Sequence, residues 1–375
     1  IDCEKCHGPG EEHIRLTEGG QLIDVGEETD YSIVNPGKLP ISKQFDVCQQ
    51  CHLQGVNVFK DGKEISDFRP GMDLHEIYEV FIEQHPDQNA FGIASHAERL
   101  QQSQCFIQSN GKLTCTTCHD PHKSVNITDE KVYINQCQKC HQSQQVMECS
   151  AEEHLKAAVD NNCVSCHMPS GGTSDIPHVS FHDHKIRVVE EQPENQVEAI
   201  KNFIKLKSVN QTEPVPEVWG EAWLLYFERH EKNPEYLQLA EEKLRPGQFY
   251  EQARVAYYKG YYDKALQLID QAISQNANDS YSHYLRGEIL EQKQAFPEAY
   301  EAYLQSWQLN PQTVETGLKT GVMVLRYRQG DPAALEEAKV IFEALLKQKP
   351  FDERILANLG FILLNQRDIE KAESC

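Results

Sequence analysis

The sequence contains no run of about 18 apolar residues, the length that a helix needs to cross a bilayer, so we expect no membrane span. Basic residues are also scarce. Lys and Arg number 36 against 58 Asp and Glu, which gives a formal net charge of −22. Such a field repels nucleic acid and anionic membrane surfaces, and it attracts basic protein partners. We therefore expect no nucleic-acid partner.

Apolar side chains are scarce in the first half of the chain, where Cys, Gly and His are frequent instead. The second half is rich in Ala, Leu, Gln, Glu and Tyr. A chain of 375 residues is long enough for two or three domains, and this change in composition predicts that they differ in architecture. The first half needs a further source of apolar surface to form an interior.

Five segments share the pattern Cys-x-x-Cys-His, and every Cys-x-x-Cys pair in the chain is followed at once by His. Two cysteines at this spacing can each add across a vinyl group of one haem, which places the histidine under the iron as its proximal ligand. The pattern predicts five haem c groups, large apolar plates that replace a conventional core. The cysteines are Cys3 and Cys6, Cys48 and Cys51, Cys115 and Cys118, Cys137 and Cys140, and Cys163 and Cys166; the histidines are His7, His52, His119, His141 and His167.

Zinc sites and redox-active dithiols also use Cys-x-x-Cys. A structural zinc site needs four ligands and pairs two half-sites, but five half-sites are an odd number, and tetrahedral zinc does not require His beside each second Cys. A thioredoxin-like dithiol would occur once, where a strand leads into a helix. Haem attachment is favoured over both alternatives.

Nine further histidines lie within the first 184 residues, so every iron can receive a second imidazole. Bis-histidine ligation leaves no open coordination position and adapts iron to electron transfer. Asp120-Pro121 turns the chain directly after the third motif and delivers His122 close to the same group of cofactors. The expected distal ligands are His13, His96, His122, His178 and His184, with His154, His182, His85 and His75 in reserve.

Two expectations concern the segments between the motifs. Residues 73–84 are predicted to form a helix with Leu74, Ile77, Tyr78 and Phe81 on one face. Cys105 and Cys149 either form a disulfide in an oxidising compartment or remain as two buried thiols.

Residues 208–217 are predicted to be a linker, because they are polar and Pro214 and Pro216 disfavour a helix. Beyond it, a small residue recurs at intervals of 34, 39 and 34 residues. A period of 34 predicts tetratricopeptide repeats over residues 218–375, with an insertion near Gly330-Asp-Pro332 in the longer interval. The recurring residues are Ala265, Ala299, Ala338 and Ala372, with Gly287 and Gly360 at close-packing positions and Pro311 and Pro350 closing a unit.

Both ends of the chain lie inside recognisable patterns. Ile1 stands two residues before the first motif cysteine, so we expect that a cleavage or a longer protein precedes it. The last repeat is incomplete at Cys375, and we expect that the native chain continues or that another subunit covers this end.

Taken together, these segments resemble the multihaem c-type cytochromes that carry C-terminal tetratricopeptide repeats. The resemblance rests on residues 3–13, on Phe68-Arg-Pro-Gly71, on residues 105–122 and on residues 176–186, besides the repeats. It implies export, covalent haem, electron transfer and further haem motifs upstream. Pentahaem nitrite reductases are more distant in style, because they use a Lys variant at the catalytic haem and no Cys-x-x-Cys-Lys occurs here.

We therefore expect a mainly α protein with a loop-rich pentahaem cytochrome c domain at 1–207 and a tetratricopeptide solenoid at 218–375. The expected function is that of an exported electron carrier, periplasmic or extracellular. Its repeats would dock redox proteins or further copies of the chain, including copies in a filament. The alternative is a multihaem oxidoreductase in which one open haem acts on a small nitrogen or sulfur compound.

Overall fold

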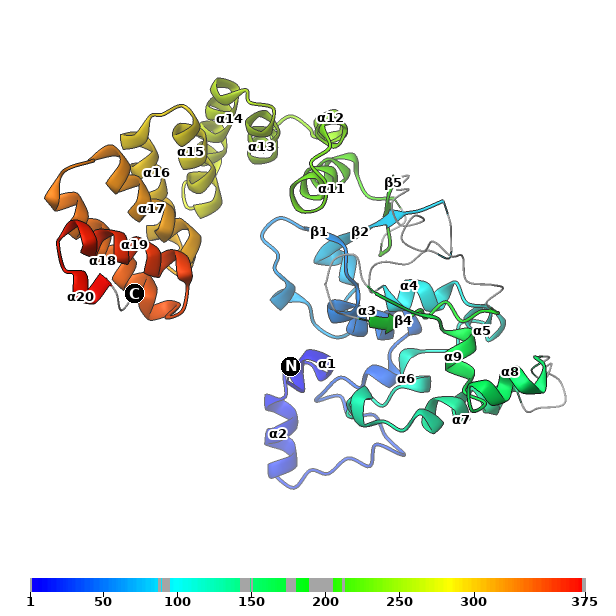
Figure 1. Ribbon diagram of the computed structural model, residues 1–375. Helices are drawn as coiled ribbons and strands as arrows, with labels where there is room; N and C mark the ends of the chain where they lie inside the picture. The colour runs from blue at the N-terminus through cyan, green and yellow to red at the C-terminus, as the bar shows by residue number, and fades with distance from the viewer. Residues whose placement is uncertain are drawn as a thin grey trace. The chain divides into compact units, whose positions relative to one another are not determined.

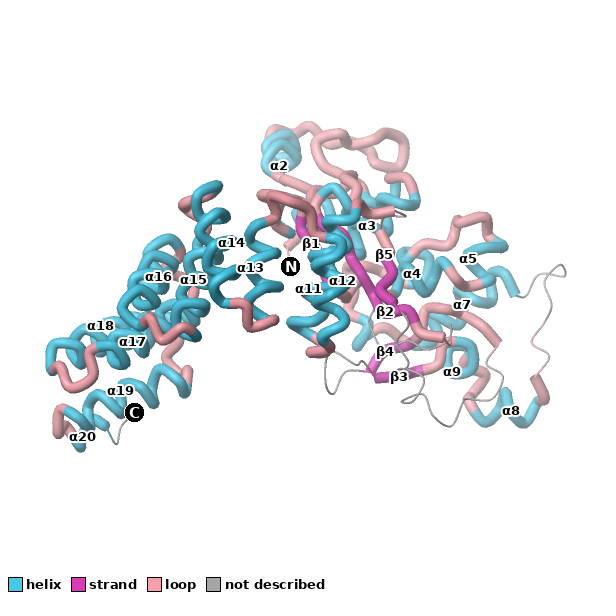
Figure 2. The backbone as a smooth tube through the Cα atoms, turned by 90° about the horizontal axis from the view of Figure 1, so that it is seen from above, coloured by secondary structure: helices cyan, strands magenta, loops and turns pink. Residues whose placement is uncertain are grey.

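The computed structural model describes residues 2–86, 89, 95–141, 149, 151–172, 180–188, 205–210 and 213–372. The chain divides into two units, Ile1–Pro214 and Val215–Cys375, here called the N-terminal and the C-terminal unit (Figure 1). Helices are the main regular structure, so the mainly α fold expected from the sequence is confirmed (Figure 2).

The N-terminal unit consists of short helices, long connections and two small sheets. Its helices are α1 (Glu4–His7), α2 (Glu11–Glu18), α3 (Ile41–His52), α4 (His96–Gln101), α5 (Gln104–Gln108), α6 (Cys115–Cys118), α7 (Glu130–His141), α8 (Glu153–Ala158) and α9 (Cys163–His167), with 3-10 turns η1 (Pro36–Lys38), η2 (Ile65–Asp67), η3 (Leu74–Glu76) and η4 (Val125–Ile127). Its strands are β1 (Val56–Phe59), β2 (Tyr78–Gln84), β3 (Ser170–Gly172), β4 (Ser180–His182) and β5 (Lys205–Ser208).

The larger sheet has the antiparallel order β1-β2-β5, and it corrects the helix predicted over residues 73–84. Only the turn η3 is helical there, and β2 pairs with both neighbours, Phe81 lying opposite Val56 on one side and Ser208 on the other. Tyr78 to Phe81 are all buried. Leu74, Ile77, Tyr78 and Phe81 have the spacing of one helix face, but a strand buried on both faces also carries apolar residues at neighbouring positions, so the pattern of so short a segment does not separate the two.

The larger sheet contributes to a small hydrophobic cluster, and a second cluster lies between two helices. Leu74, Ile77 and Val80 are fully buried in the first cluster, beneath β2. The second cluster joins α3 to α4 through Phe45, Ala97 and Leu100. These contacts hold the end of α3, which carries the second motif, beside the start of α4.

The C-terminal unit is a succession of antiparallel helix pairs, as a tetratricopeptide solenoid requires. Neighbouring helices pack in sequence order, from α11 against α12 to α19 against α20. The helices are α11 (Pro216–Arg229), α12 (Pro234–Lys243), α13 (Phe249–Tyr258), α14 (Tyr262–Gln275), α15 (Ser280–Gln292), α16 (Phe296–Leu309), α17 (Val314–Tyr327), α18 (Pro332–Gln348), α19 (Glu353–Asn365) and α20 (Ile369–Ala372).

Small residues let these helices approach closely. A Cβ on Gly287 would lie 2.6 Å from the Tyr303 ring, which explains the glycine predicted at a close-packing position. Ala265, Ala299 and Ala338 are fully buried in the second helices of three pairs. The additional residues of the longer repeat mostly lengthen a helix, because α18 has 17 residues and α16 has 14, so the predicted insertion between helices is largely wrong.

The junction of the units is shorter than the predicted linker. Ser208 is paired in the sheet, and the Asn210 side chain accepts a hydrogen bond from the Val80 N–H at 2.9 Å. Pro216 is the first residue of α11, where its fixed φ suits a helix and no intrahelical N–H is needed. The unit boundary falls at 214/215, inside the predicted segment. Within the described ranges, no helix is both long enough and apolar enough to cross a bilayer.

Candidate haem-binding site

Each Cys-x-x-Cys-His segment contains a single helical turn. We number the segments motif 1 (residues 3–7), motif 2 (48–52), motif 3 (115–119), motif 4 (137–141) and motif 5 (163–167). They occupy α1, the last turn of α3, α6, the last turn of α7, and α9. In a helix, residues three apart share a face, so the two thiols of each motif point to the same side, as two adjacent vinyl groups require.

The five motifs adjoin one another in chain order. Burial and the nearby thiols of Cys48 and Cys51 raise the pKa of Cys6, which links motifs 1 and 2. The Cys48 thiol of motif 2 donates a hydrogen bond to Cys115 of motif 3, which together with burial raises the Cys48 pKa. Helix α7 of motif 4 packs against both α6 of motif 3 and α9 of motif 5.

Three motif histidines face a second imidazole. The ring centres of His7 and His122 are 6.1 Å apart with planes at 11°, and those of His119 and His184 are 6.2 Å apart at 30°. Metal–imidazole nitrogen bonds are about 2 Å long and the ring centre lies about 1 Å behind the nitrogen, so opposite ligands of one iron have centres roughly 6 Å apart. Both spacings therefore fit an iron between the rings.

The third pair lies beside the second. His52 of motif 2 and His96 at the start of α4 have ring centres 5.6 Å apart, slightly less than an iron requires. The rings of His96 and His184 are only 4.3 Å apart, which is too close for a shared iron. These two histidines can therefore serve different irons while remaining in contact.

Hydrogen bonds hold several rings by one nitrogen. The Nδ1 of His7 lies 2.8 Å from the Val34 carbonyl oxygen, that of His167 lies 2.9 Å from the Arg187 carbonyl, and that of His184 lies 3.0 Å from the His182 carbonyl. An N–H donated from Nδ1 fixes the tautomer that leaves Nε2 free as an acceptor, the usual second contact of a metal-ligating histidine. The donor chemistry thus fits iron ligation at Nε2.

Burial keeps the central imidazoles neutral. It lowers the pKa of His96 to about 3, with further lowering by the nearby His184, His52 and His119. Burial likewise lowers the pKa of His184 to about 4, and it lowers that of His119. A neutral imidazole is the form that binds a metal, so no proton has to be displaced at neutral pH.

Other predicted distal ligands lie elsewhere. His13 is half-exposed on α2, and its Nδ1 bonds to Asp30 at 2.8 Å. His178 lies outside the described residues. Among the reserves, His154 is exposed beside Glu152, and His85 is buried against Glu83. His182 bonds through Nδ1 to the Met168 carbonyl at 2.9 Å.

The two remaining motif histidines have no second ring in the part of the chain that the structure describes. His141 is exposed at the end of α7, and His167 is held only through its Nδ1. Nor is any group of three or more His, Cys, Asp or Glu within the described ranges arranged to hold a metal ion alone. Iron ligated by two imidazoles needs no such group.

Sequence reasoning missed three features of this region. The Tyr133 ring lies 5.4 Å from His119, and Phe181 lies 5.6 Å from His96. Asp183 is fully buried against Arg99, and its place between His182 and His184 was the available signal. Neither alternative predicted for Cys105 and Cys149 holds in full, because both thiols are free but Cys149 is exposed and Cys105 is only partly buried. Cys105 lies near motif 4. Burial raises the pKa of the Cys105 thiol, and the nearby Cys140 thiol of motif 4 raises it further.

Comparison with known proteins gives one family match and one relative that covers part of the chain. Residues 250–312 match the family described as tetratricopeptide repeat, so the C-terminal unit contains these repeats. The chain is also 24% identical over 193 residues to the dissimilatory sulfite reductase MccA of Wolinella succinogenes, a match that covers 45% of this chain. The chain spans about a fifth of the length of that relative (22%).

Solved structures with likeness to the chain include MamA proteins and tetratricopeptide domains. MamA from Desulfovibrio magneticus is 16% identical with a TM-score of 0.35, over 43% of this chain and 91% of that one. The second tetratricopeptide domain of human RPAP3, solved in complex with an HSP70 peptide, is 18% identical with a TM-score of 0.27, over 35% of this chain and 98% of that one.

Proposed function

We propose that the N-terminal unit binds five haem c groups and that the protein transfers electrons through them as an exported carrier, periplasmic or extracellular. The observation that carries the proposal is the spacing of the imidazole pairs. His7 and His122, and His119 and His184, are separated as the two axial ligands of one iron are. Each pair joins a Cys-x-x-Cys-His segment to a histidine outside that segment's own five residues.

In this proposal the chain's residues have separate tasks. The cysteines of each motif would hold a haem through thioethers, the motif histidine would be one iron ligand, and His122, His96 and His184 would be the second ligand in motifs 1, 2 and 3. Bound in this way, low-spin iron supplies one-electron transfer without an open coordination position. Neighbouring thiols link motifs 1 to 3 and helix packing links motifs 3 to 5, which supports a continuous path along the unit.

The C-terminal unit contains tetratricopeptide repeats, which mediate protein–protein interaction. We propose that it docks a redox partner or another copy of this chain, so that electrons leave or enter the N-terminal unit at a defined place. The strongly negative charge supports basic partners. Removal of residues 218–375 is expected to abolish partner binding and leave haem spectra unchanged.

The test is the mass and the spin state of the full chain, produced in a host that attaches haem to exported proteins. Five added haem masses and low-spin spectra are expected. His122→Ala should convert the iron of motif 1 to a high-spin or a differently ligated state, detectable by electron paramagnetic resonance (EPR). The control His230→Ala removes an exposed imidazole of the C-terminal unit and should change nothing. An apoprotein mass, or equal effects of the two substitutions, contradicts the proposal.

A second function is a multihaem oxidoreductase acting on a small nitrogen or sulfur compound. It is favoured by the likeness to a sulfite reductase and by His141, beside which no described imidazole lies. An iron held by His141 alone would retain an open position for such a compound. A high-spin signal in the isolated protein that changes on addition of sulfite, nitrite or hydroxylamine would support this function; uniformly low-spin spectra would exclude it.

A further inference from the structure

A buried carboxylate lies at the centre of the candidate ligands. Asp183 follows strand β4 between His182 and His184, and no part of it is exposed to solvent. Its own N–H donates to the Pro169 carbonyl at 2.9 Å, which joins it to the segment after motif 5. An isolated buried carboxylate is unfavourable by several kcal/mol, so its partners must be part of the architecture.

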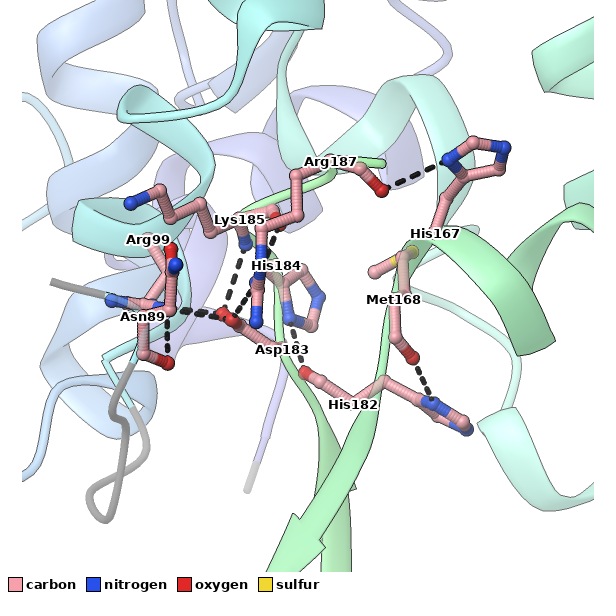
Figure 3. Close-up of polar contacts among 9 residues, drawn as sticks. All are labelled: Asn89, Arg99, His167, Met168, His182, Asp183, His184, Lys185 and Arg187. Atoms are coloured by element: carbon pink, nitrogen blue, oxygen red, sulfur yellow. Dashed lines mark hydrogen bonds and ion pairs between the residues drawn. The ribbon is translucent and has the colours of Figure 1, made fainter. Parts of the chain in front are cut away.

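Two arginines and a backbone N–H satisfy this carboxylate (Figure 3). Arg99 binds it in a bidentate fork, with Nε 2.8 Å from one oxygen and Nη2 2.6 Å from the other. Arg187 donates to it from Nη1 at 2.5 Å, and the Lys185 N–H donates at 3.0 Å. The fork fixes the plane of the carboxylate, because both parallel hydrogen bonds must be kept.

Each partner is connected to a different candidate iron ligand. Arg99 lies three residues after His96 on the short helix α4, so the two side chains share one face. His184 is the residue next to Asp183. The backbone of Arg187 holds motif 5 at two points, since its N–H donates to the His167 carbonyl at 3.1 Å and its carbonyl accepts from His167 Nδ1 at 2.9 Å.

The cluster also has a net charge. One carboxylate and two guanidinium groups sum to +1, and Asp183 and Arg99 are almost inaccessible to water. A positive charge in a medium of low dielectric constant stabilises the reduced form of a nearby iron, which gains an electron, and so raises its reduction potential.

We propose that Asp183, with Arg99 and Arg187, is a positioning centre that fixes the rings of His96, His184 and His167 and thereby sets the spectra and potentials of the irons they bind. This inference rests on the proposed function, because it concerns haem ligation. It assigns a role to three residues that bind no cofactor themselves. Arg99 acts on His96 through helix α4, Asp183 acts on the adjacent His184, and Arg187 acts on His167 through the backbone of motif 5.

The experiment compares Asp183→Asn, Arg99→Lys and Arg187→Lys in the full haem-loaded chain. The two lysine variants retain the charge but lose the guanidinium geometry, so they should change the EPR g-values of the low-spin signals with little shift in midpoint potential. Asp183→Asn removes a negative charge and should shift at least one potential upward as well. Glu79→Gln is the matched control, because Glu79 is an equally buried carboxylate that is ion-paired with Lys60 in the other sheet.

The outcomes are distinguishable. Altered g-values in the lysine variants and an unaltered spectrum in Glu79→Gln support the positioning centre. Five haems with spectra identical to the parent protein in both lysine variants overturn it, as does an equal change in Glu79→Gln. If Asp183→Asn does not accumulate, the two lysine variants alone decide between these outcomes. A parent protein without covalent haem overturns the proposed function itself, and this inference with it.

Discussion

The two units are helical for different reasons. In the C-terminal unit, each helix from α11 to α19 buries side chains against its neighbours, as do Leu318 and Val324 of α17 with Phe342 of α18. In the N-terminal unit, α3 buries Phe45 and Val47, but the other four motif helices, α1, α6, α7 and α9, bury no residue. Helices as short as these are unstable alone, and tertiary contacts normally stabilise them. In the proposed function, haem supplies the apolar surface that the motif helices lack.

The largest expected effect comes from removing one attachment point. The double variant Cys115→Ala with Cys118→Ala should lose one haem and destabilise the N-terminal unit by more than about 4 kcal/mol, in the range for loss of a structural metal or disulfide. The C-terminal unit should keep its unfolding temperature in calorimetry, because its core contains only side chains. Cys149→Ala is the control, since this thiol is exposed and outside the motifs. If both units unfolded together in the double variant, the two units would not be stabilised independently and the comparison would be wrong.

The reverse experiment perturbs the C-terminal unit. Gly287→Val places a branched side chain where even a Cβ would lie 2.6 Å from Tyr303, so it should cost about 1–3 kcal/mol by overpacking. Helical circular dichroism during chemical unfolding measures this cost, and haem absorbance should be unchanged. Glu301→Ala on the exposed face of α16 should stay within about 0.5 kcal/mol of the parent protein. A haem spectrum altered by Gly287→Val would show that the units are coupled.

The two units should also lose their structure at different pH values when the solution is acidified. His96 and His184 have pKa values of about 3 and about 4 in the folded protein, against about 6.5 in an unfolded chain. The unfolded state therefore binds protons first. Stability from these neutral rings is complete above about pH 6.5 and is lost as the pH falls toward 4 and then 3. In the chain prepared without haem, amide hydrogen exchange of the N-terminal unit should therefore rise at a higher pH than that of the C-terminal unit, and coincident midpoints would contradict this.

The smallest effect concerns Asp46 on α3. Burial raises its pKa to about 6, above the value of about 3.9 in an unfolded chain, so the folded state loses stability as the pH rises from about 4 through 6. Asp46→Asn should stabilise the N-terminal unit by about 1 kcal/mol at pH 7, allowing for partial solvent exposure, and by almost nothing at pH 4. Unfolding at the two pH values measures the difference. An equal gain at both would indicate a cause other than ionisation.

Much of the C-terminal unit could be predicted because its contacts are local and periodic. Ala265, Ala299 and Ala338 mark the same buried place in successive repeats, and a repeat contacts only its neighbours. The insertion predicted near Gly330-Asp-Pro332 is correctly located, because α18 begins at Pro332, but a repeat period does not show whether added residues lengthen a helix or a connection. The structure places most of the additional length in α18.

In the N-terminal unit, only features formed by neighbouring residues, such as the Cys-x-x-Cys-His segments, could be predicted. The predicted helix over 73–84 was wrong because strand β2 is determined by its pairing with β1 and with β5, which comes more than a hundred residues later. The linker was predicted too long for the same reason, since β5 reaches Ser208.

By itself, the sequence determined the five Cys-x-x-Cys-His segments and the repeat period, because a covalent spacing of three residues and a period of 34 are properties of the chain alone. Only the tertiary structure decided which histidines face each other. His7 meets His122 and His119 meets His184 across separations of 115 and 65 residues. Such pairs depend on packing between segments that are far apart in the chain, and no spacing in the sequence records this packing. Beside His184, the ion pair of Arg99 with Asp183 is a further contact of this kind.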